Sequence, residues 1–332
     1  MKNTTNFQAK LNAILQHHTP ANVSLAKEIS ELLGISLDST YRRLRNETDY
    51  TLNEVAAISQ HFDIPLEALN NELQSVVTFK VNNLNNDMAS YEAYLDNMLN
   101  SIERLRQFEQ PQLIFAAEDV PVFYHFSQPR LMNFKIIYWL KSLLNISDFQ
   151  FTHFEDIQLP QGILDTAANI YKGYEKIQDT EVWTTETVLS TLKQIRFYWD
   201  AGFFNSIETA EGVLEDLEAA IRKIQRDSET GYRFNNGSMT SVPFKLFISD
   251  VMIGTNCILC KAGNYTASFI SYSSFNFMQT TNVNFNEQNE QWLNNILSKS
   301  TLISGVAEKQ RNQFFKQIYR QIADLKDYFR SN

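Results

Sequence analysis

A run of arginines near the start of the chain is the group of side chains best suited to bind another molecule. Hydroxyl side chains precede the arginines and an amide follows them, so that the set consists of Ser39, Thr40, Arg42, Arg43, Arg45 and Asn46. An arginine guanidinium can bind a phosphate or pair with the edge of a guanine, and asparagine can pair with adenine. Small hydroxyl residues let a phosphate approach the N-terminus of a helix. This combination predicts contact with double-stranded DNA.

These side chains fall within a predicted helix over Leu37–Asn46. Because successive residues of a helix are rotated by about 100°, Leu37, Tyr41 and Leu44 share one face, which we expect to pack inward. The face that carries the arginines would then point outward. A solvated helix face is the simpler explanation of this pattern taken alone, but the place of the helix in the chain favours DNA.

Apolar periodicity and helix-end signals predict a group of short helices around this one. The predicted ranges are Phe7–Gln16, Leu25–Leu33, Leu37–Asn46, a helix that follows Thr51, and a short fifth helix over Ile64–Leu69. Ser24 is placed to cap the second helix and Gly34 to end it. A turn of about three residues between the second and third helices is the helix-turn-helix arrangement, in which the third helix reads DNA.

This segment is similar to a known family. Ile29–Ser36, Thr40–Leu44 and Leu52–Leu69 resemble the bacterial helix-turn-helix domains of the λ repressor and Cro type. In that resemblance Ser30 takes the position where a small residue lets two helices cross closely, and Gly34 takes the position of the turn glycine. The resemblance implies a bacterial DNA-binding transcriptional regulator.

The charge of this segment points the other way. Residues 1–75 contain six Lys and Arg against nine Asp and Glu, a net charge of −3, within a chain of net charge −9. With so few cations, one copy would bind DNA weakly and with strong salt dependence, so we expect a homodimer. The acidity leaves an alternative open, namely a protein–protein interaction factor that keeps the helix-turn-helix fold without binding DNA.

Composition sets the class of protein. The 332 residues are 43% apolar and 20% charged with only 10 Gly and 7 Pro, which is typical of a folded chain of two or three domains with long helices. Two cysteines permit no disulfide framework, and the sequence has neither a signal peptide nor an apolar run of about 18 residues. We therefore expect a cytoplasmic protein with no membrane partner.

The predicted fold is mainly α. We expect a helix-turn-helix domain over residues 1–73, a linker over 74–87, a helical domain over 88–230, and a small α+β region over 231–332 packed on the helical domain. Strands rich in aromatic and β-branched residues are predicted at Phe244–Val251, Asn256–Lys261 and Tyr265–Phe277, and they would form a small antiparallel sheet. A short extended run is also predicted over Leu113–Ala117.

Two long amphipathic helices are candidate surfaces for dimerisation. Over Met88–Phe108, apolar residues recur at alternating spacings of four and three, which is a short heptad pattern. A helix that lies on its own domain explains this pattern equally well. The last predicted helix, Val306–Phe329, is also amphipathic and is the second candidate.

A stretch rich in hydroxyl groups before the last helix is a candidate site for an anionic effector. Its residues are Ser300, Thr301, Ser304, Gly305 and Lys309. Hydroxyl groups, a helix N-terminus and a lysine can together bind an anion, and the effector itself, a small molecule or a peptide, is unidentified. An ordinary helix cap by Ser304 explains the same residues.

Other groups able to carry chemistry are few. Cys257 and Cys260 form a lone CxxC without the second pair that a zinc ribbon needs, and on a strand they would point to opposite faces. We expect them to be buried apolar cysteines, and we expect His125 to be buried among aromatic rings. The sequence contains no catalytic triad, metal-ligand spacing or cofactor motif. We therefore predict a transcriptional regulator rather than an enzyme, without metal or cofactor, whose C-terminal part dimerises and senses a ligand.

Overall fold

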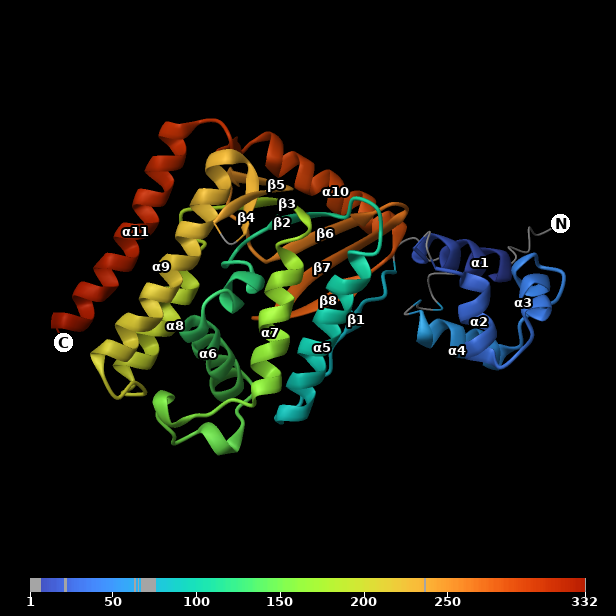
Figure 1. The fold of residues 1–332 in the computed structure, drawn as a ribbon, viewed down its shortest axis with the longest axis horizontal. Coiled ribbons are helices and arrows are strands. Elements are labelled where there is room, and N and C mark those ends of the chain that lie inside the picture. The colour runs from blue at the N-terminus through green and yellow to red at the C-terminus, as the bar shows by residue number, and fades with distance from the viewer. Residues whose placement is uncertain are drawn as a thin grey trace.

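The computed structural model describes residues 7–20, 23–62, 64, 66, 76–235 and 237–331. In Figure 1 the helices α1–α4 lie together at one end of the molecule, and the elements from β1 onward form a larger body of helices and strands. Among the helices of the described ranges, none is both long and apolar enough to span a lipid bilayer.

Four helices make up the described part of the N-terminal group. They are α1 (Phe7–His18), α2 (Leu25–Leu33), α3 (Leu37–Leu44) and α4 (Leu52–His61). Their shared core is apolar and consists of Leu11, Leu15, Ile29, Tyr50, Ile58, Phe62 and Ile64. The helices therefore follow the predicted ranges closely, except that the fifth predicted helix, Ile64–Leu69, falls largely outside the described residues.

The larger body contains seven further helices in the described chain. They are α5 (Met88–Leu105), α6 (Pro129–Tyr138), α7 (Gln161–Tyr174), α8 (Leu189–Asp200), α9 (Ile207–Thr230), α10 (Val283–Ser298) and α11 (Glu308–Ser331). Short helical turns link β2 to α7 around α6, and they are η2 (Val122–Phe126), η3 (Trp139–Leu143), η4 (Ser147–Phe149) and η5 (Phe154–Asp156).

The strands of this body form one mixed sheet rather than the predicted small antiparallel one. They are β1 (Lys80–Val81), β2 (Gln112–Ala116), β3 (Gln178–Trp183), β4 (Tyr232–Asn235), β5 (Ser238–Ile248), β6 (Cys257–Ala262), β7 (Tyr265–Ser273), β8 (Asn276–Thr280) and β9 (Thr301–Leu302). Their order is β1-β8-β7-β6-β2-β3-β5-β4, with β9 paired to β5, which makes nine strands over the described ranges. The mainly α fold class with a small sheet near the C-terminus was therefore wrong.

Parallel pairing at the centre of the sheet explains the error. β2 pairs with β3 and β3 pairs with β5 in parallel, whereas the other neighbours are antiparallel. Parallel strands need long crossover connections, and here α6, α7, α8 and α9 lie in those connections. A segment that reads as helical in sequence therefore contributes two central strands to the sheet.

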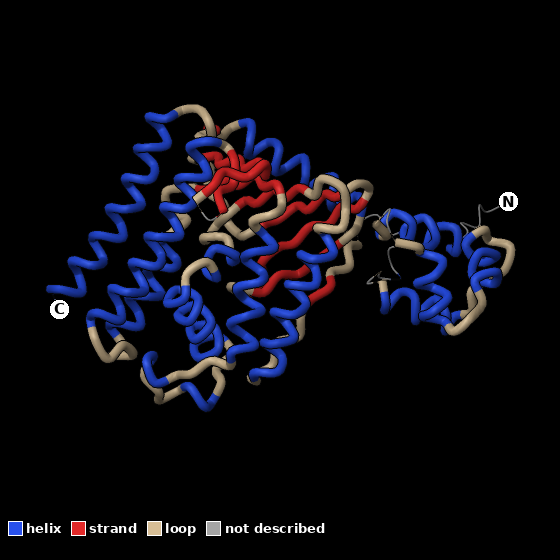
Figure 2. Tube along the Cα trace, in the orientation of Figure 1, coloured by secondary structure: helices blue, strands red, loops and turns tan. Residues whose placement is uncertain are grey.

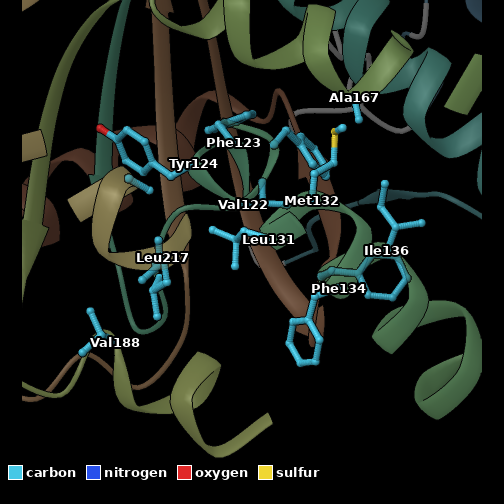
Figure 3. Packing of buried hydrophobic residues seen from close by; sticks show 14 of the residues in the cluster. Val122, Phe123, Tyr124, Leu131, Met132, Phe134, Ile136, Ala167, Val188 and Leu217 are labelled. Atoms are coloured by element: carbon cyan, nitrogen blue, oxygen red, sulfur yellow. The ribbon is translucent and has the colours of Figure 1, made fainter. Parts of the chain in front are cut away.

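The two faces of the sheet pack against different helices (Figures 1 and 2). On β2, Phe115 joins the main core with α5, α6, α7 and α9, whereas its neighbour Ala116 joins a smaller cluster with Leu293 and Ile296 of α10. Side chains alternate between faces along a strand, so one strand serves both clusters. Figure 3 shows part of the main core, with Phe123 of η2 near the side chains of α6.

Both helix stripes predicted as dimer contacts are covered by the chain itself. Tyr91, Leu95 and Ile102 of α5 are buried, and α5 packs on α7. Phe315 and Ile322 of α11 are buried as well, and α11 packs on α8 and α9. The Met88–Phe108 helix therefore lies on its own domain, which was the alternative explanation of its heptad pattern.

Candidate nucleic-acid interface

Local hydrogen bonds build the turn that presents α3. Ser24 caps α2 by accepting a hydrogen bond from the Lys27 N–H, as predicted. Gly34 ends α2 with a φ of 64°, in the left-handed region that glycine adopts without strain. The Ser30 hydroxyl then donates to the Ile35 carbonyl at 2.6 Å, and Ser36 caps α3 by accepting from the Ser39 N–H. The sequence therefore fixes both ends of the turn.

The orientation of α3 differs from the prediction. Leu37 and Tyr41, expected to pack inward, are 48% and 49% exposed, and only Leu44 of the predicted apolar face packs against the domain core. Thr40, expected to face DNA, is fully buried, and its hydroxyl donates to the Ser36 carbonyl at 3.2 Å. The predicted inward face was therefore wrong.

Arg43 explains why the helix is rotated. Its Nη2 lies 2.9 Å from Oε1 of Glu54 in the first turn of α4, and its Nη1 donates to the Ser39 hydroxyl at 2.8 Å. The long apolar stem of an arginine can pack like an aliphatic side chain while its end group satisfies a partner. Polar side chains thus occupy the inward positions that periodicity assigned to Leu37 and Tyr41.

The exposed face of α3 consists of residues at helical spacings of three, four and seven. They are Asp38, Tyr41, Arg42 and Arg45. The Arg42 side chain forms no ion pair with any residue in the described ranges. Arg45 pairs with Glu47 at 2.8 Å, but both side chains are about half exposed, and such surface pairs are weak. Two guanidinium groups are thus available on this face.

The remaining candidate residues lie at its edges. Ser39 is half-buried and its hydroxyl is engaged with Arg43, whereas Asn46 is exposed just beyond the helix with a φ of 59°. The Asn46 Oδ1 accepts a hydrogen bond from Asn12 at 3.1 Å, which ties this residue to α1. The structure therefore brings Arg42, Arg45 and Asn46 to the exposed side and turns Thr40 and Arg43 inward, and DNA contact itself stays a prediction.

In the candidate effector stretch, most hydrogen-bonding groups already serve the fold. The Ser304 hydroxyl accepts from the Leu246 N–H at 2.7 Å, the Ser300 hydroxyl donates to the Ile296 carbonyl at 2.8 Å, and the Gly305 N–H donates to the Ser228 carbonyl. Thr301 lies in β9 and Lys309 is exposed near the start of α11. Because α11 begins at Glu308, Ser304 does not cap it. Anion binding at this stretch stays a prediction.

The two cysteines and His125 are placed as predicted. Cys257 and Cys260 are free and buried on β6, and they belong to the clusters on opposite faces of the sheet. Burial raises the pKa of Cys257 to about 11 and that of Cys260 to about 12. His125 is buried edge-on to Trp139, and burial together with Lys135 lowers its pKa well below the usual value.

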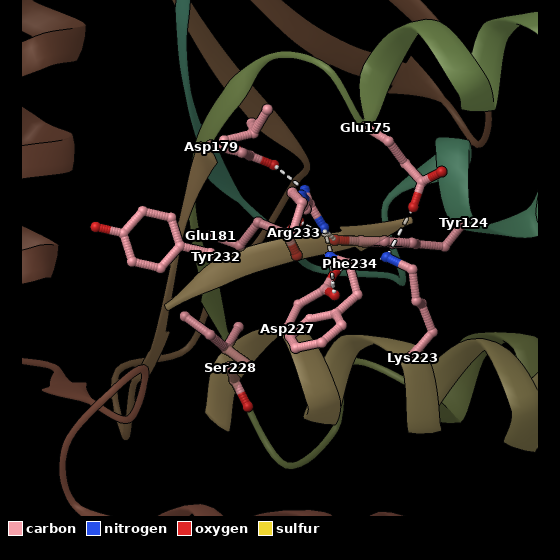
Figure 4. Close-up of polar contacts among 12 residues, drawn as sticks. Tyr124, Glu175, Asp179, Glu181, Lys223, Asp227, Ser228, Tyr232, Arg233 and Phe234 are labelled. Carbon is pink, nitrogen blue, oxygen red and sulfur yellow. Dashed lines mark hydrogen bonds and ion pairs between the residues drawn. The ribbon is translucent and has the colours of Figure 1, made fainter. Parts of the chain in front are cut away.

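A buried charged cluster lies beside the sheet, and sequence reasoning missed it (Figure 4). Asp179 and Glu181, two residues apart on β3, are fully buried and lie on the same face of the strand. The Arg233 Nη2 of β4 lies 3.3 Å from Asp179 and 3.4 Å from Glu181. The hydroxyls of Tyr124 and Tyr174 donate to these carboxylates.

This cluster ties β3 and β4 to α9. The Arg233 Nη1 also lies 3.4 Å from Asp227, which in turn pairs with Lys223 at 2.8 Å. Burial and the nearby charge of Glu181 raise the pKa of Asp179 well above its usual range, so the cluster favours a proton on that carboxyl. The repeat of an acid at every second position of Gln178–Trp183 was the signal that would have found it.

The comparisons with known proteins identify only the N-terminal part. Residues 3–90 match the family model of the BetR domain, an N-terminal regulatory domain of the helix-turn-helix type. The matched range includes α1–α4, the exposed face of α3 and β1. The comparison with curated proteins and the comparison with solved structures each gave no match.

Proposed function

We propose that this chain is a DNA-binding transcriptional regulator of the λ repressor and Cro type, as found in bacteria. The observation that carries the proposal is the exposed face of α3, where Arg42 and Arg45 stand clear of the domain core in a segment that matches a helix-turn-helix regulatory family. In such domains the second helix of the motif lies in the major groove with side chains against base edges.

The exposed side chains suit distinct parts of a DNA duplex. Arg42, which has no competing ion pair in the described chain, can pair with a guanine edge or bind a phosphate. Arg45 can exchange its exposed contact with Glu47 for a phosphate, and the Tyr41 ring can lie against a thymine methyl group. Arg43 and Thr40 contribute by holding the helix in place rather than by touching DNA.

The proposal includes a homodimer and a sensing role for the larger body. One helix-turn-helix domain covers one half-site, and two half-sites about 34 Å apart require a fixed symmetric link between two copies. We assign that link and the response to an effector to the body that begins at β1. The proposal assigns no catalytic activity to the chain.

A salt series of DNA binding tests this function. Fluorescence anisotropy would follow the full chain on DNA fragments from upstream of its own gene. We expect binding that weakens steeply with salt and falls about tenfold or more in Arg42→Ala, because a specific guanidinium contact is worth about 1–3 kcal/mol. Arg320→Ala, which removes the same charge from an exposed position of α11, is the matched control and should bind as the wild type does.

The second candidate function is a protein–protein interaction factor, which the net charge of −3 in residues 1–75 favours. Absence of binding to every fragment at low salt would reject the DNA-binding proposal and leave this alternative. Equal loss of affinity in Arg42→Ala and Arg320→Ala would show that attraction is general and that α3 is not the contact surface.

A further inference from the structure

An apolar pocket of about 380 Å³ lies between α5 and the part of the sheet formed by β6, β7 and β8. Met98 and Ile102 of α5 line one side, and Tyr265, Phe269 and Phe277 line the other. Protein interiors are close-packed, and voids larger than a water molecule are rare. A space of this size has the dimensions of a small-molecule site.

The lining changes from polar and exposed to apolar and buried. Lys80, Asn97 and Ser101 are exposed at one part of the pocket, whereas Ile177 and Cys260 at another part are buried. Such a gradient suits a molecule whose body enters the protein and whose polar end stays near water. Phe269 and Phe277 are half-buried, so their rings remain accessible from the pocket.

The charges of the pocket all have one sign. Lys80 of β1 and Arg104 of α5 belong to its lining, and no Asp or Glu is among the lining residues that the structure describes. In a chain of net charge −9 this arrangement is unusual. Two cations beside an apolar space with low dielectric attract an anionic group far more strongly than they would in water.

We propose that this pocket binds a small amphipathic anion, with an apolar ring or chain against Met98, Phe269 and Phe277 and an acidic head group at Lys80 and Arg104. This inference rests on the proposed function, because it names the class of effector that the larger body senses. It differs from the stretch before α11, since none of Ser300, Thr301, Ser304, Gly305 and Lys309 lines the pocket.

The strand that carries Lys80 offers a route to the N-terminal helices. The Thr280 hydroxyl of β8 donates to the Thr78 carbonyl at 2.8 Å, and the Asn276 side chain donates to the Asn82 carbonyl at 2.9 Å. These contacts hold the segment between the helix-turn-helix domain and α5 against the sheet edge. An anion bound at Lys80 therefore acts on the part of the larger body that is nearest in sequence to the DNA-binding domain.

Two matched fluorescent probes test the site in the full-length protein. Anilinonaphthalene sulfonate has an aromatic body and an anionic head, and N-phenylnaphthylamine has the same body without the charge. We expect saturable binding of the sulfonate at one molecule per chain, weakened about tenfold by Lys80→Met and by Arg104→Met. The neutral probe should bind these variants and the wild type alike.

A third variant tests the location of the apolar body. Met98→Trp places a larger side chain in the pocket from the half-buried face of α5, and it should reduce the binding of both probes. Unchanged far-ultraviolet circular dichroism would show that each variant is folded. Failure of the sulfonate to saturate, or binding that none of the three variants weakens, would overturn the proposal. Arg42→Ala should leave probe binding unchanged, so failure of the DNA-binding proposal is read separately.

Discussion

Arg43 and Glu54 form a partly buried ion pair that joins the third and fourth helices. The Nη2–Oε1 distance is 2.9 Å, and the two side chains are only 13% and 17% exposed. Glu54 also accepts a hydrogen bond from the Thr51 N–H, which completes the cap of α4. Although partial burial acts in the opposite direction, the contacts with Thr51 and Arg43 lower the pKa of Glu54. Two adjacent arginines, Arg42 and Arg43, therefore have different roles.

The first prediction separates these two roles. Arg43→Ala should destabilise the N-terminal helices by about 1–3 kcal/mol, because Glu54 is left half-buried without its partner. Hydrogen–deuterium exchange of peptides from α3 and α4 in the full chain would measure the loss. Arg42→Ala should leave the exchange unchanged, since its side chain contacts solvent. Equal protection in the two variants would contradict the assignment of Arg43 to the domain core.

The second prediction concerns the thiol groups. Because burial raises the pKa of Cys257 to about 11 and that of Cys260 to about 12, neither forms a reactive thiolate at pH 8. A chromogenic disulfide reagent should detect no fast-reacting thiol in the native chain and both thiols after unfolding in guanidinium chloride. A thiol that reacts in the native chain as fast as free cysteine would show that one face of β6 is open to solvent.

Local signals allowed the N-terminal helices to be predicted closely. Ser24 and Gly34 act within one turn of the helix end, so their effect depends on the adjacent backbone alone. The faces of α3 depended on contacts far away in the sequence. Only Glu54 on α4 makes the inward position of Arg43 favourable, and no pattern within Leu37–Leu44 records that partner.

The sheet could not be predicted for a related reason. β3 is central and pairs on both sides, yet it carries Asp179 and Glu181 where a buried strand is expected to be apolar. These acids are tolerated because Arg233, some fifty residues later, and two tyrosines surround them. Chain distance hid the compensation, so the strand was not recognised and the sheet was judged small.

The third prediction tests how closely α5 and α7 pack. A Cβ added at Gly173 of α7 would lie 2.6 Å from Cγ2 of Ile102, so Gly173→Ala should destabilise the larger body by about 1–3 kcal/mol. Gly162→Ala in the same helix has no atom within 4 Å of the added Cβ and is the control, with neutral or slightly increased stability expected. Urea unfolding would measure both.

A second substitution at the contact locates the clash. In an Ile102→Ala background the added methyl group of Gly173→Ala should cost less than it does in the wild type, because Cγ2 of Ile102 is gone. An unchanged cost in that background would mean that the destabilisation arises elsewhere.

The last prediction follows from the raised pKa of Asp179. Burial and Glu181 make the folded state hold a proton on this carboxyl that the unfolded chain releases near its ordinary pKa of 3.8. As the pH rises from that value through the raised pKa, the folded state binds more protons than the unfolded state, so stability falls, by up to about 1.4 kcal/mol per pH unit for one proton. Asp179→Asn cannot titrate and should lack this loss.

The difference between the two chains isolates this carboxyl from all other titrating groups. Unfolding in urea at pH 5, 6, 7 and 8 would be followed by tryptophan fluorescence, because all 4 Trp lie between residues 139 and 292 and Trp183 donates to Glu181 at 2.7 Å. The stability of Asp179→Asn relative to wild type should increase steadily with pH. Asp250→Asn, at an exposed position, should show no such trend. Parallel pH profiles for wild type and Asp179→Asn would mean that Asp179 is ionised in the folded chain and that Arg233 outweighs the effects of burial and of Glu181.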